Sequence, residues 1–125
     1  MALGDQETVL SANEAFYDAF AAADMNAMES IWAQEADISC LHPGWPRLTG
    51  RDEVLNSWRG ILENPNRPRI ECTDATVSIY GDVAVVLCYE QLDNGHLLAT
   101  NIFVREEGAW RMAHHHAGGP VNPPE

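Results

Sequence analysis

Apolar positions in the first half of the chain recur at the spacing of α-helices. A first helix is predicted from Asp5 to about Ala23. Apolar side chains recur there in steps of three and four residues and so share one stripe of the helix: Val9, Ala12, Phe16, Ala19 and Phe20. Asp24 can cap a short second helix whose inward residues are Met28, Ile31 and Trp32. A capping-box variant at residues 49–52 precedes a third helix with inward residues Val54, Leu55, Trp58, Ile61 and Leu62.

The second half of the chain has the composition of β-strands. After a short strand at 36–41 and an irregular loop at 42–46, long strands are predicted at 69–80, 83–92, 96–105 and 110–119. Tight turns separate the long strands at 81–82, 93–95 and 106–108. Consecutive hairpins of this kind predict an antiparallel meander.

Three helices followed by a meander predict an α+β fold in one domain spanning residues 1–125. We expect a curved, mostly antiparallel sheet to wrap around the three N-terminal helices as a cone. A pocket would lie at its open end, between the concave face, the first helix and the 42–46 loop. The stretch from Val83 to Tyr89 is apolar on both faces, which favours a second subunit on the outer face and hence a homodimer.

The charge and cysteine content exclude several classes of function. The formal net charge of the 125 residues is -12, so the chain lacks the basic surface that nucleic acids and anionic membranes require. No apolar stretch approaches the roughly 20 residues of a membrane helix and no signal peptide is evident, which favours the cytosol.

The three cysteines, Cys40, Cys72 and Cys88, lack zinc-type spacing and are interpreted as reduced thiols, with Cys88 in the core. The basic residues are all Arg, which hints at a GC-rich, bacterial genome.

Three consecutive histidines, His114 to His116, lie within the last predicted strand. Alternation places His114 and His116 on one face with Trp110 and Met112, and His115 on the other, so the inner face carries an imidazole in either register. Sharing a face with Trp110 and Met112 points His114 and His116 toward the core. An i, i+2 pair could supply two metal ligands but would need a third from elsewhere, and no metal motif supports this; we expect neither metal nor cofactor.

Glu90 and Asn101 are polar residues within apolar strands. If Glu90 points into the cavity, desolvation raises its pKa and suits it to general acid–base catalysis; otherwise it is an exposed carboxylate or pairs with an Arg. Asn101 could stabilise an oxyanion or only satisfy a neighbouring backbone group.

The 42–46 loop and the third helix supply candidates for the cavity mouth. His42 could reach the mouth, and Trp45 and Trp58 could form an aromatic wall for an apolar or ring-shaped ligand. Alternatively, both indoles plug the open end and His42 caps the loop.

The order of elements and several motifs resemble the nuclear transport factor 2-like superfamily, and more narrowly its SnoaL-like branch. The motifs are His42-Pro43-Gly44-Trp45, Leu48-Thr49-Gly50, Ser57-Trp58, the segment 99–103 and the terminal segment 110–116. The resemblance implies a cystatin-like cone with a deep cavity, usually dimeric. The superfamily includes ketosteroid isomerase, scytalone dehydratase, polyketide cyclases and limonene epoxide hydrolase, and also non-catalytic association domains.

The functional residues of ketosteroid isomerase are mostly replaced in this sequence, whereas the pocket positions of the kinase association domain can be matched. The oxyanion-hole tyrosine of ketosteroid isomerase falls on Phe16, beside Tyr17, its catalytic aspartate near Cys40, and its protonated aspartate near Asn101. Steroid isomerisation by that mechanism is therefore not expected. The kinase association domain shares the Trp and His-x-His spacing of the last strand, and its pocket positions match Glu90, Asn101 and Ala117. This comparison favours His115 as the histidine that faces the cavity.

The residues and the resemblance together predict a cavity for a small apolar or ring-containing organic molecule. In the catalytic hypothesis, cofactor-free isomerase, dehydratase or cyclase chemistry uses Glu90, His115 and Asn101. The substrate-binding residues would be Tyr17, His42, Trp45, Trp58, His114 and His116. The alternatives are a non-catalytic ligand-binding or association module and a metal-dependent hydrolase, and the sequence leaves open whether the chain is an enzyme.

Overall fold

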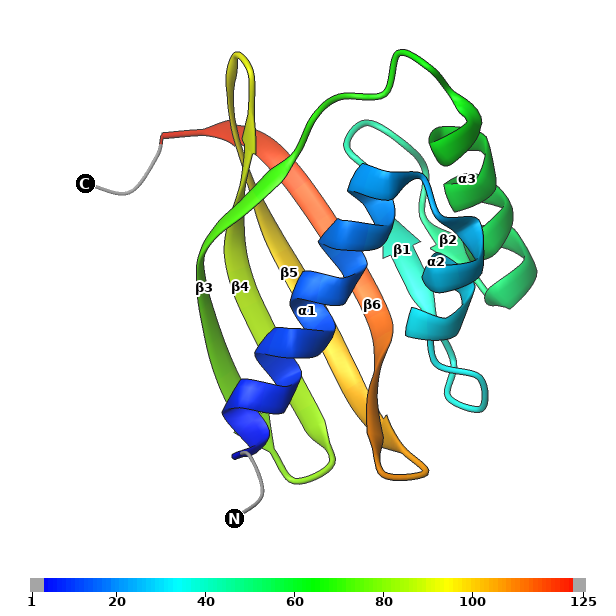
Figure 1. Ribbon diagram of the computed structural model, residues 1–125, viewed down its shortest axis with the longest axis vertical. Helices are drawn as coiled ribbons and strands as arrows, with labels where there is room; N and C mark the ends of the chain where they lie inside the picture. The colour runs from blue at the N-terminus through cyan, green and yellow to red at the C-terminus, as the bar shows by residue number, and fades with distance from the viewer. Residues whose placement is uncertain (1–3, 123–125) are drawn as a thin grey trace.

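The computed structural model of the chain describes residues 4–122. The first three and last three residues of the predicted 1–125 domain lie outside the described residues. The described residues form three helices and one six-stranded, curved, open sheet, with α1 lying diagonally across the concave face (Figure 1). The predicted α+β fold is confirmed. Among residues 4–122, no helix combines the length and apolar character needed to cross a membrane.

The helices begin and end close to the predicted residues. They are α1 (Asp5–Ala22), α2 (Met25–Ile31) and α3 (Arg51–Glu63). Asp24 caps α2 as predicted, because its Oδ1 accepts the N–H of Ala27 at 3.1 Å. The capping box of α3 forms only in part. Gly50 is the N-cap and offers no side chain, whereas Glu53 Oε2 accepts the N–H of Thr49 at 2.9 Å.

The strands form the predicted meander with one short addition. They are β1 (Ser39–Leu41), β2 (Leu48–Thr49), β3 (Glu71–Tyr80), β4 (Val83–Leu92), β5 (Gly95–Glu106) and β6 (Ala109–Val121). Their order in the sheet is β2-β1-β6-β5-β4-β3, and the pair β1–β6 is parallel while the others are antiparallel. The two-residue β2 is too short for a hydrophobic period and was not predicted.

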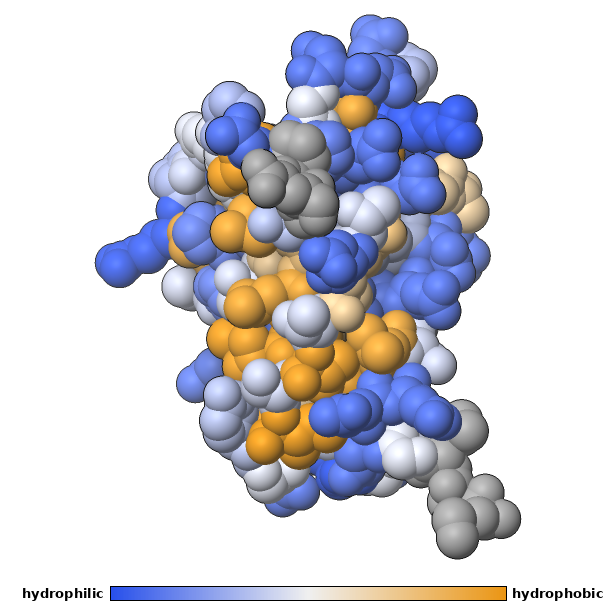
Figure 2. All heavy atoms as spheres, turned by 90° about the vertical axis from the view of Figure 1, so that its left-hand side faces the viewer, coloured by the Kyte–Doolittle hydropathy of each residue, from blue (hydrophilic) through white to orange (hydrophobic). Residues whose placement is uncertain are grey.

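The outer face of the sheet carries exposed apolar side chains that the rest of residues 4–122 leaves uncovered. Leu87 is 48% exposed, and Val83 and Leu98 are also exposed large hydrophobic residues. An apolar patch is visible on the side of the molecule where β3 and β4 lie (Figure 2). An apolar surface of this kind is typical of a site that contacts another molecule.

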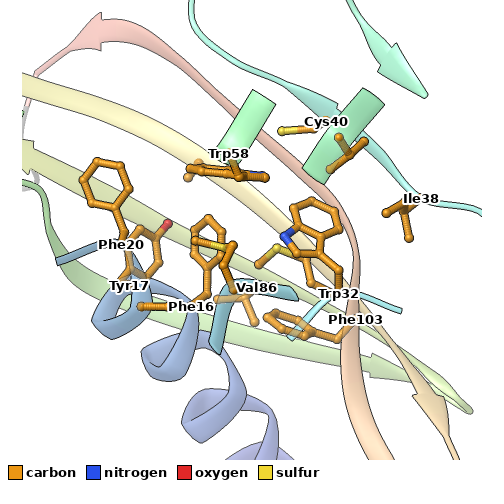
Figure 3. Packing of buried hydrophobic residues seen from close by; sticks show 14 of the residues in the cluster. Phe16, Tyr17, Phe20, Trp32, Ile38, Cys40, Trp58, Val86 and Phe103 are labelled. Carbon is orange, nitrogen blue, oxygen red and sulfur yellow. The ribbon is translucent and has the colours of Figure 1, made fainter. Parts of the chain in front are cut away.

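The inner face of the sheet and the helices enclose the core. Phe16 on α1, Trp32 after α2, Trp58 on α3 and Phe103 on β5 converge there (Figure 3). Arg51 fastens α3 to α2, since its Nη1 donates to the carbonyl of Ala33 at 2.9 Å and its Nη2 to that of Glu29 at 3.1 Å. The bond to Glu29 satisfies a carbonyl in the last turn of α2, which has no helical partner there.

A β-bulge in β6 decides which of the three histidines faces inward. Ile102 pairs with His114 but Phe103 pairs with Met112, so Ala113 is an extra residue in β6. An extra residue shifts the alternation of side chains by one position. His115 is consequently buried and His116 exposed. The inward direction predicted for His114 and His116 from the phase of Trp110 and Met112 is thus corrected.

Candidate functional site

A cavity of about 410 Å³ opens between α1, α3, the loop after β1 and the inner face of the sheet. Most of its wall is apolar or aromatic. The lining residues are Phe16, Tyr17, Phe20, His42, Pro43, Trp45, Trp58, Ile61, Pro68, Ile70, Glu90, Leu92, Leu97, His115 and Ala117. This size and this mostly apolar wall are those of a small-molecule site.

Glu90 and His115 are the paired polar groups of the cavity wall. They extend from β4 and β6, and β5 lies between these strands. Glu90 is 2% exposed and His115 3% exposed, and 3.8 Å separates Glu90 Oε2 from His115 Nε2. This distance is longer than a direct hydrogen bond, which leaves room for a ligand atom to bridge the two groups.

Tyr17 and Asn101 connect the pair from behind. Tyr17 Oη donates to Glu90 Oε2 at 2.7 Å, and Asn101 Nδ2 donates to Tyr17 Oη at 3.2 Å. Asn101 Oδ1 lies 2.5 Å from His115 Nδ1. The four side chains are therefore arranged as a ring. Three of its contacts are hydrogen bonds, and the fourth is the 3.8 Å gap between Glu90 and His115.

Burial disfavours a charge on either member of the pair. Desolvation raises the pKa of the Glu90 carboxyl, and the Tyr17 hydroxyl opposes this rise only in part. Desolvation, together with repulsion from the other imidazoles, lowers the pKa of His115 to about 3. His115 is therefore a neutral imidazole, and its contact with Glu90 is not an ion pair, because a charge on the buried ring would be poorly solvated.

The mouth of the cavity is aromatic. The ring of His42 lies 4.8 Å from those of both Trp45 and Trp58, measured between centroids. His42 Nε2 is 2.9 Å from Ser57 Oγ, and burial lowers the pKa of His42 to about 4. Trp45 is 48% exposed at the rim, whereas Trp58 is buried. The indoles line the cavity without filling it.

The predicted site residues divide into three groups. Those that line the cavity are Tyr17, His42, Trp45, Trp58, Glu90 and His115. Asn101 is fully buried behind the wall, where it holds His115 and Tyr17. His114 and His116 lie on the opposite face of β6 from His115 and do not line the cavity; His114 Nδ1 is bonded to Ser39 Oγ at 2.7 Å.

Asn13 belongs to the site but was missed in the sequence. It is 1% exposed and accepts from Asn101 Nδ2 at 2.8 Å. Asn13 lies four residues from Val9 and three from Phe16, so it falls on the buried stripe of α1. A polar residue within an apolar stripe was the available signal. Cys40, near which the resemblance placed the isomerase's aspartate, is a buried thiol whose pKa desolvation raises to about 12.

Comparisons with known proteins agree with this architecture. The model of the SnoaL-like domain family matches residues 9–122. A proposed dehydratase of the NTF2-like family from Streptomyces avermitilis is 38% identical; the match covers 95% of this chain and 97% of that one, with a TM-score of 0.84. A proposed calcium/calmodulin-dependent protein kinase type II association domain from Thiobacillus denitrificans is 33% identical, with 92% and 96% coverage and a TM-score of 0.81.

A plant protein also contains a similar segment. The F-box protein SKIP8 of Arabidopsis thaliana is 27% identical over 111 residues, which are 87% of this chain and 48% of that protein. The chain thus spans about half the length of this relative.

Proposed function

Because this chain belongs to the SnoaL-like family, we propose that it binds a small, ring-containing organic molecule in the cavity and performs cofactor-free acid–base chemistry on it. The reaction would be an isomerisation, a dehydration or a cyclisation. The observation that carries this proposal is the buried Glu90–His115 pair at the wall of a cavity that is otherwise mostly apolar.

Each member of the pair has a role that follows from its protonation state. Burial favours the protonated form of Glu90, and in that form the carboxyl can donate a proton to an oxygen of the ligand. The neutral His115 can accept a proton at Nε2. A carboxyl with a raised pKa is a more effective acid–base group near neutral pH than an ordinary carboxyl. Tyr17 steadies Glu90, and Asn101 acts on His115 rather than directly on an oxyanion.

The second candidate is a non-catalytic ligand-binding or association module. It is favoured by the 33% identity to a protein named as a kinase association domain, and by the uncovered apolar face of the sheet. We also propose that this face forms a homodimer. Both candidates share this surface, so only the chemistry of the cavity separates them.

Proton transfer can be tested with cyclic β-hydroxy ketones in D2O, where NMR detects both loss of water and exchange of the α-proton. The wild type and the surface control Glu63→Gln should react, whereas Glu90→Gln and His115→Asn should lose about 100-fold or more of the rate. A rate that is unchanged in Glu90→Gln would remove the acid–base role. Ligand binding without any reaction in the four proteins would favour the binding module.

A further inference from the structure

The hydrogen-bond ring behind the cavity determines which nitrogen of His115 carries the proton. We propose that Asn101, held by Asn13 and Tyr17, fixes the tautomer of His115 and thereby selects a ligand with a neutral hydroxyl group on an apolar body. This inference rests on the proposed small-molecule function of the same cavity. It names the class of ligand and two positioning residues, Asn13 and Asn101.

The assignment begins at Glu90. Tyr17 has one hydroxyl hydrogen and donates it to Glu90 at 2.7 Å. Tyr17 can therefore only accept from Asn101, so Asn101 turns its NH2 group toward Tyr17 at 3.2 Å. The same NH2 group donates its other hydrogen to Asn13 Oδ1 at 2.8 Å. Both donors of Asn101 are thus occupied.

The carbonyl of Asn101 is left facing His115. An amide oxygen only accepts, so His115 must carry its proton on Nδ1, 2.5 Å away. A neutral imidazole has one N–H, and burial keeps His115 neutral. Nε2 therefore presents a lone pair on the side of Glu90.

The same logic applies at the mouth of the cavity. Ser57 donates its hydroxyl hydrogen to the carbonyl of Val54 at 2.7 Å, so it can only accept from His42 Nε2. His42 therefore carries its proton on Nε2. Both imidazoles of the cavity commit their N–H to the protein and offer the ligand no donor.

The geometry of the pair suits a single hydroxyl group. An oxygen atom at the usual hydrogen-bond distance of about 2.8 Å from each group can bridge Glu90 and His115, which are 3.8 Å apart. A hydroxyl donates to His115 Nε2, and it accepts from Glu90 in the protonated form that burial favours. A ketone can only accept, which leaves His115 without a partner.

Anionic ligands are disfavoured by the rest of the wall. No Arg is among the residues that line the cavity in the described part of the chain, and Glu90 is its acidic group. The chain as a whole carries a formal net charge of -12. A carboxylate or phosphate would lose its hydration and gain no cation in exchange.

The tautomer can be read directly by long-range 1H–15N NMR of the histidine rings, with His115→Asn used to assign the signals. The wild type should show the Nδ1–H form of His115. Asn101→Leu should shift His115 toward the Nε2–H form, and Asn13→Ala should do so in part. Asn56→Ala, on the exposed face of α3, should change nothing. An Nε2–H form in the wild type would overturn the proposal, even if the Asn101 variant does not fold.

Selectivity can be tested by calorimetry with 2-cyclohexylethanol, 1-cyclohexylpropan-2-one and 3-cyclohexylpropanoate. The wild type should bind the alcohol about tenfold more tightly than the ketone, as one hydrogen bond allows, and the carboxylate more weakly still. Asn101→Leu should reduce the preference for the alcohol to about threefold or less.

Equal affinity for the ketone or the carboxylate, or no binding of the alcohol at millimolar concentration, would overturn the ligand class. A preference for the alcohol without turnover of the hydroxy ketones would instead leave this inference standing and remove the proposed reaction.

Discussion

Tyr17 of α1 donates a hydrogen bond to Glu90 of β4, and this bond of 2.7 Å joins the helix to the cavity's acidic group. The bond stabilises the carboxylate form, because a hydroxyl donates more strongly to a charged oxygen than to a neutral one. Burial acts in the opposite direction and dominates, so the pKa of Glu90 stays raised.

Replacing Tyr17 by Phe should therefore raise the pKa of Glu90 further. The variant loses the only hydroxyl that donates to Glu90 among the described residues, while the ring and its packing remain. The titration can be followed by 13C NMR of labelled Glu side chains, with Glu90→Gln used for assignment. Tyr80→Phe, a change at an exposed tyrosine, should leave the titration unaltered. A lower pKa in Tyr17→Phe would contradict the described hydrogen bond.

The stability of the protein should fall as the pH is lowered from 6.5 toward 3. The pKa of His115 is lowered from 6.5 to about 3 by burial, so the unfolded chain takes up a proton that the folded chain refuses. The contribution of His115 to the free energy of unfolding is fully present above its pKa in the unfolded chain. It is lost as the pH falls through its pKa in the folded protein. The groups that face His115 are Glu90, Asn101, Phe16 and Trp58.

Urea unfolding at pH 7, 5 and 4 checks this prediction. His115→Asn should lose less free energy of unfolding over this range than the wild type. His42 and the carboxylates titrate in both proteins, so the difference between the two losses reports on His115. Parallel losses in the two proteins would show that His115 is not the titrating group.

Replacing Leu87 by Arg should convert the proposed dimer into a monomer. Leu87 is 48% exposed on the apolar outer face of β4, and an Arg there would have to lose its hydration in a closed interface. Light scattering coupled to size-exclusion chromatography measures the mass. The control Asn56→Arg adds the same charge on the exposed face of α3 and should remain dimeric. A monomeric wild type would exclude the dimer.

Arg51→Ala should lower the free energy of unfolding by about 2–3 kcal/mol, since the carbonyls of Glu29 and Ala33 lose a charged donor. Arg59→Ala removes an exposed pair with Glu29, and should cost less than about 1 kcal/mol. Urea unfolding of the two variants gives the comparison. Equal losses would indicate that the Arg51 contacts add nothing beyond surface charge.

The sequence was sufficient for the helices and hairpins, because their periods and turn residues are local. The 83–92 strand was predicted with the bounds of β4, and α1 ends within one residue of its predicted end. The orientation of the histidines could not be predicted in this way. It depends on the pairing of Phe103 with Met112, which leaves Ala113 as the extra residue, and an alanine in a strand carries no sign of a bulge.

The hydrogen bonds of the site could not be predicted from the sequence, because they join segments that lie far apart in the chain. Glu90 was identifiable as an acid within an apolar strand, but its partner Tyr17 lies 73 positions away in the chain. The role of Asn101 changed for the same reason, since its orientation is set by Asn13, 88 positions away. Such pairs follow from packing rather than from local pattern.

Asn13 and Tyr17 lie one turn apart on the same helix, and both reach across to the sheet. The ring of side chains around His115 can therefore assemble only after α1 has docked on the sheet. A chain whose first helix is displaced would lose one wall of the cavity and leave the imidazole free to rotate. The tautomer of His115 thus depends on the docking of a helix to which His115 itself does not belong.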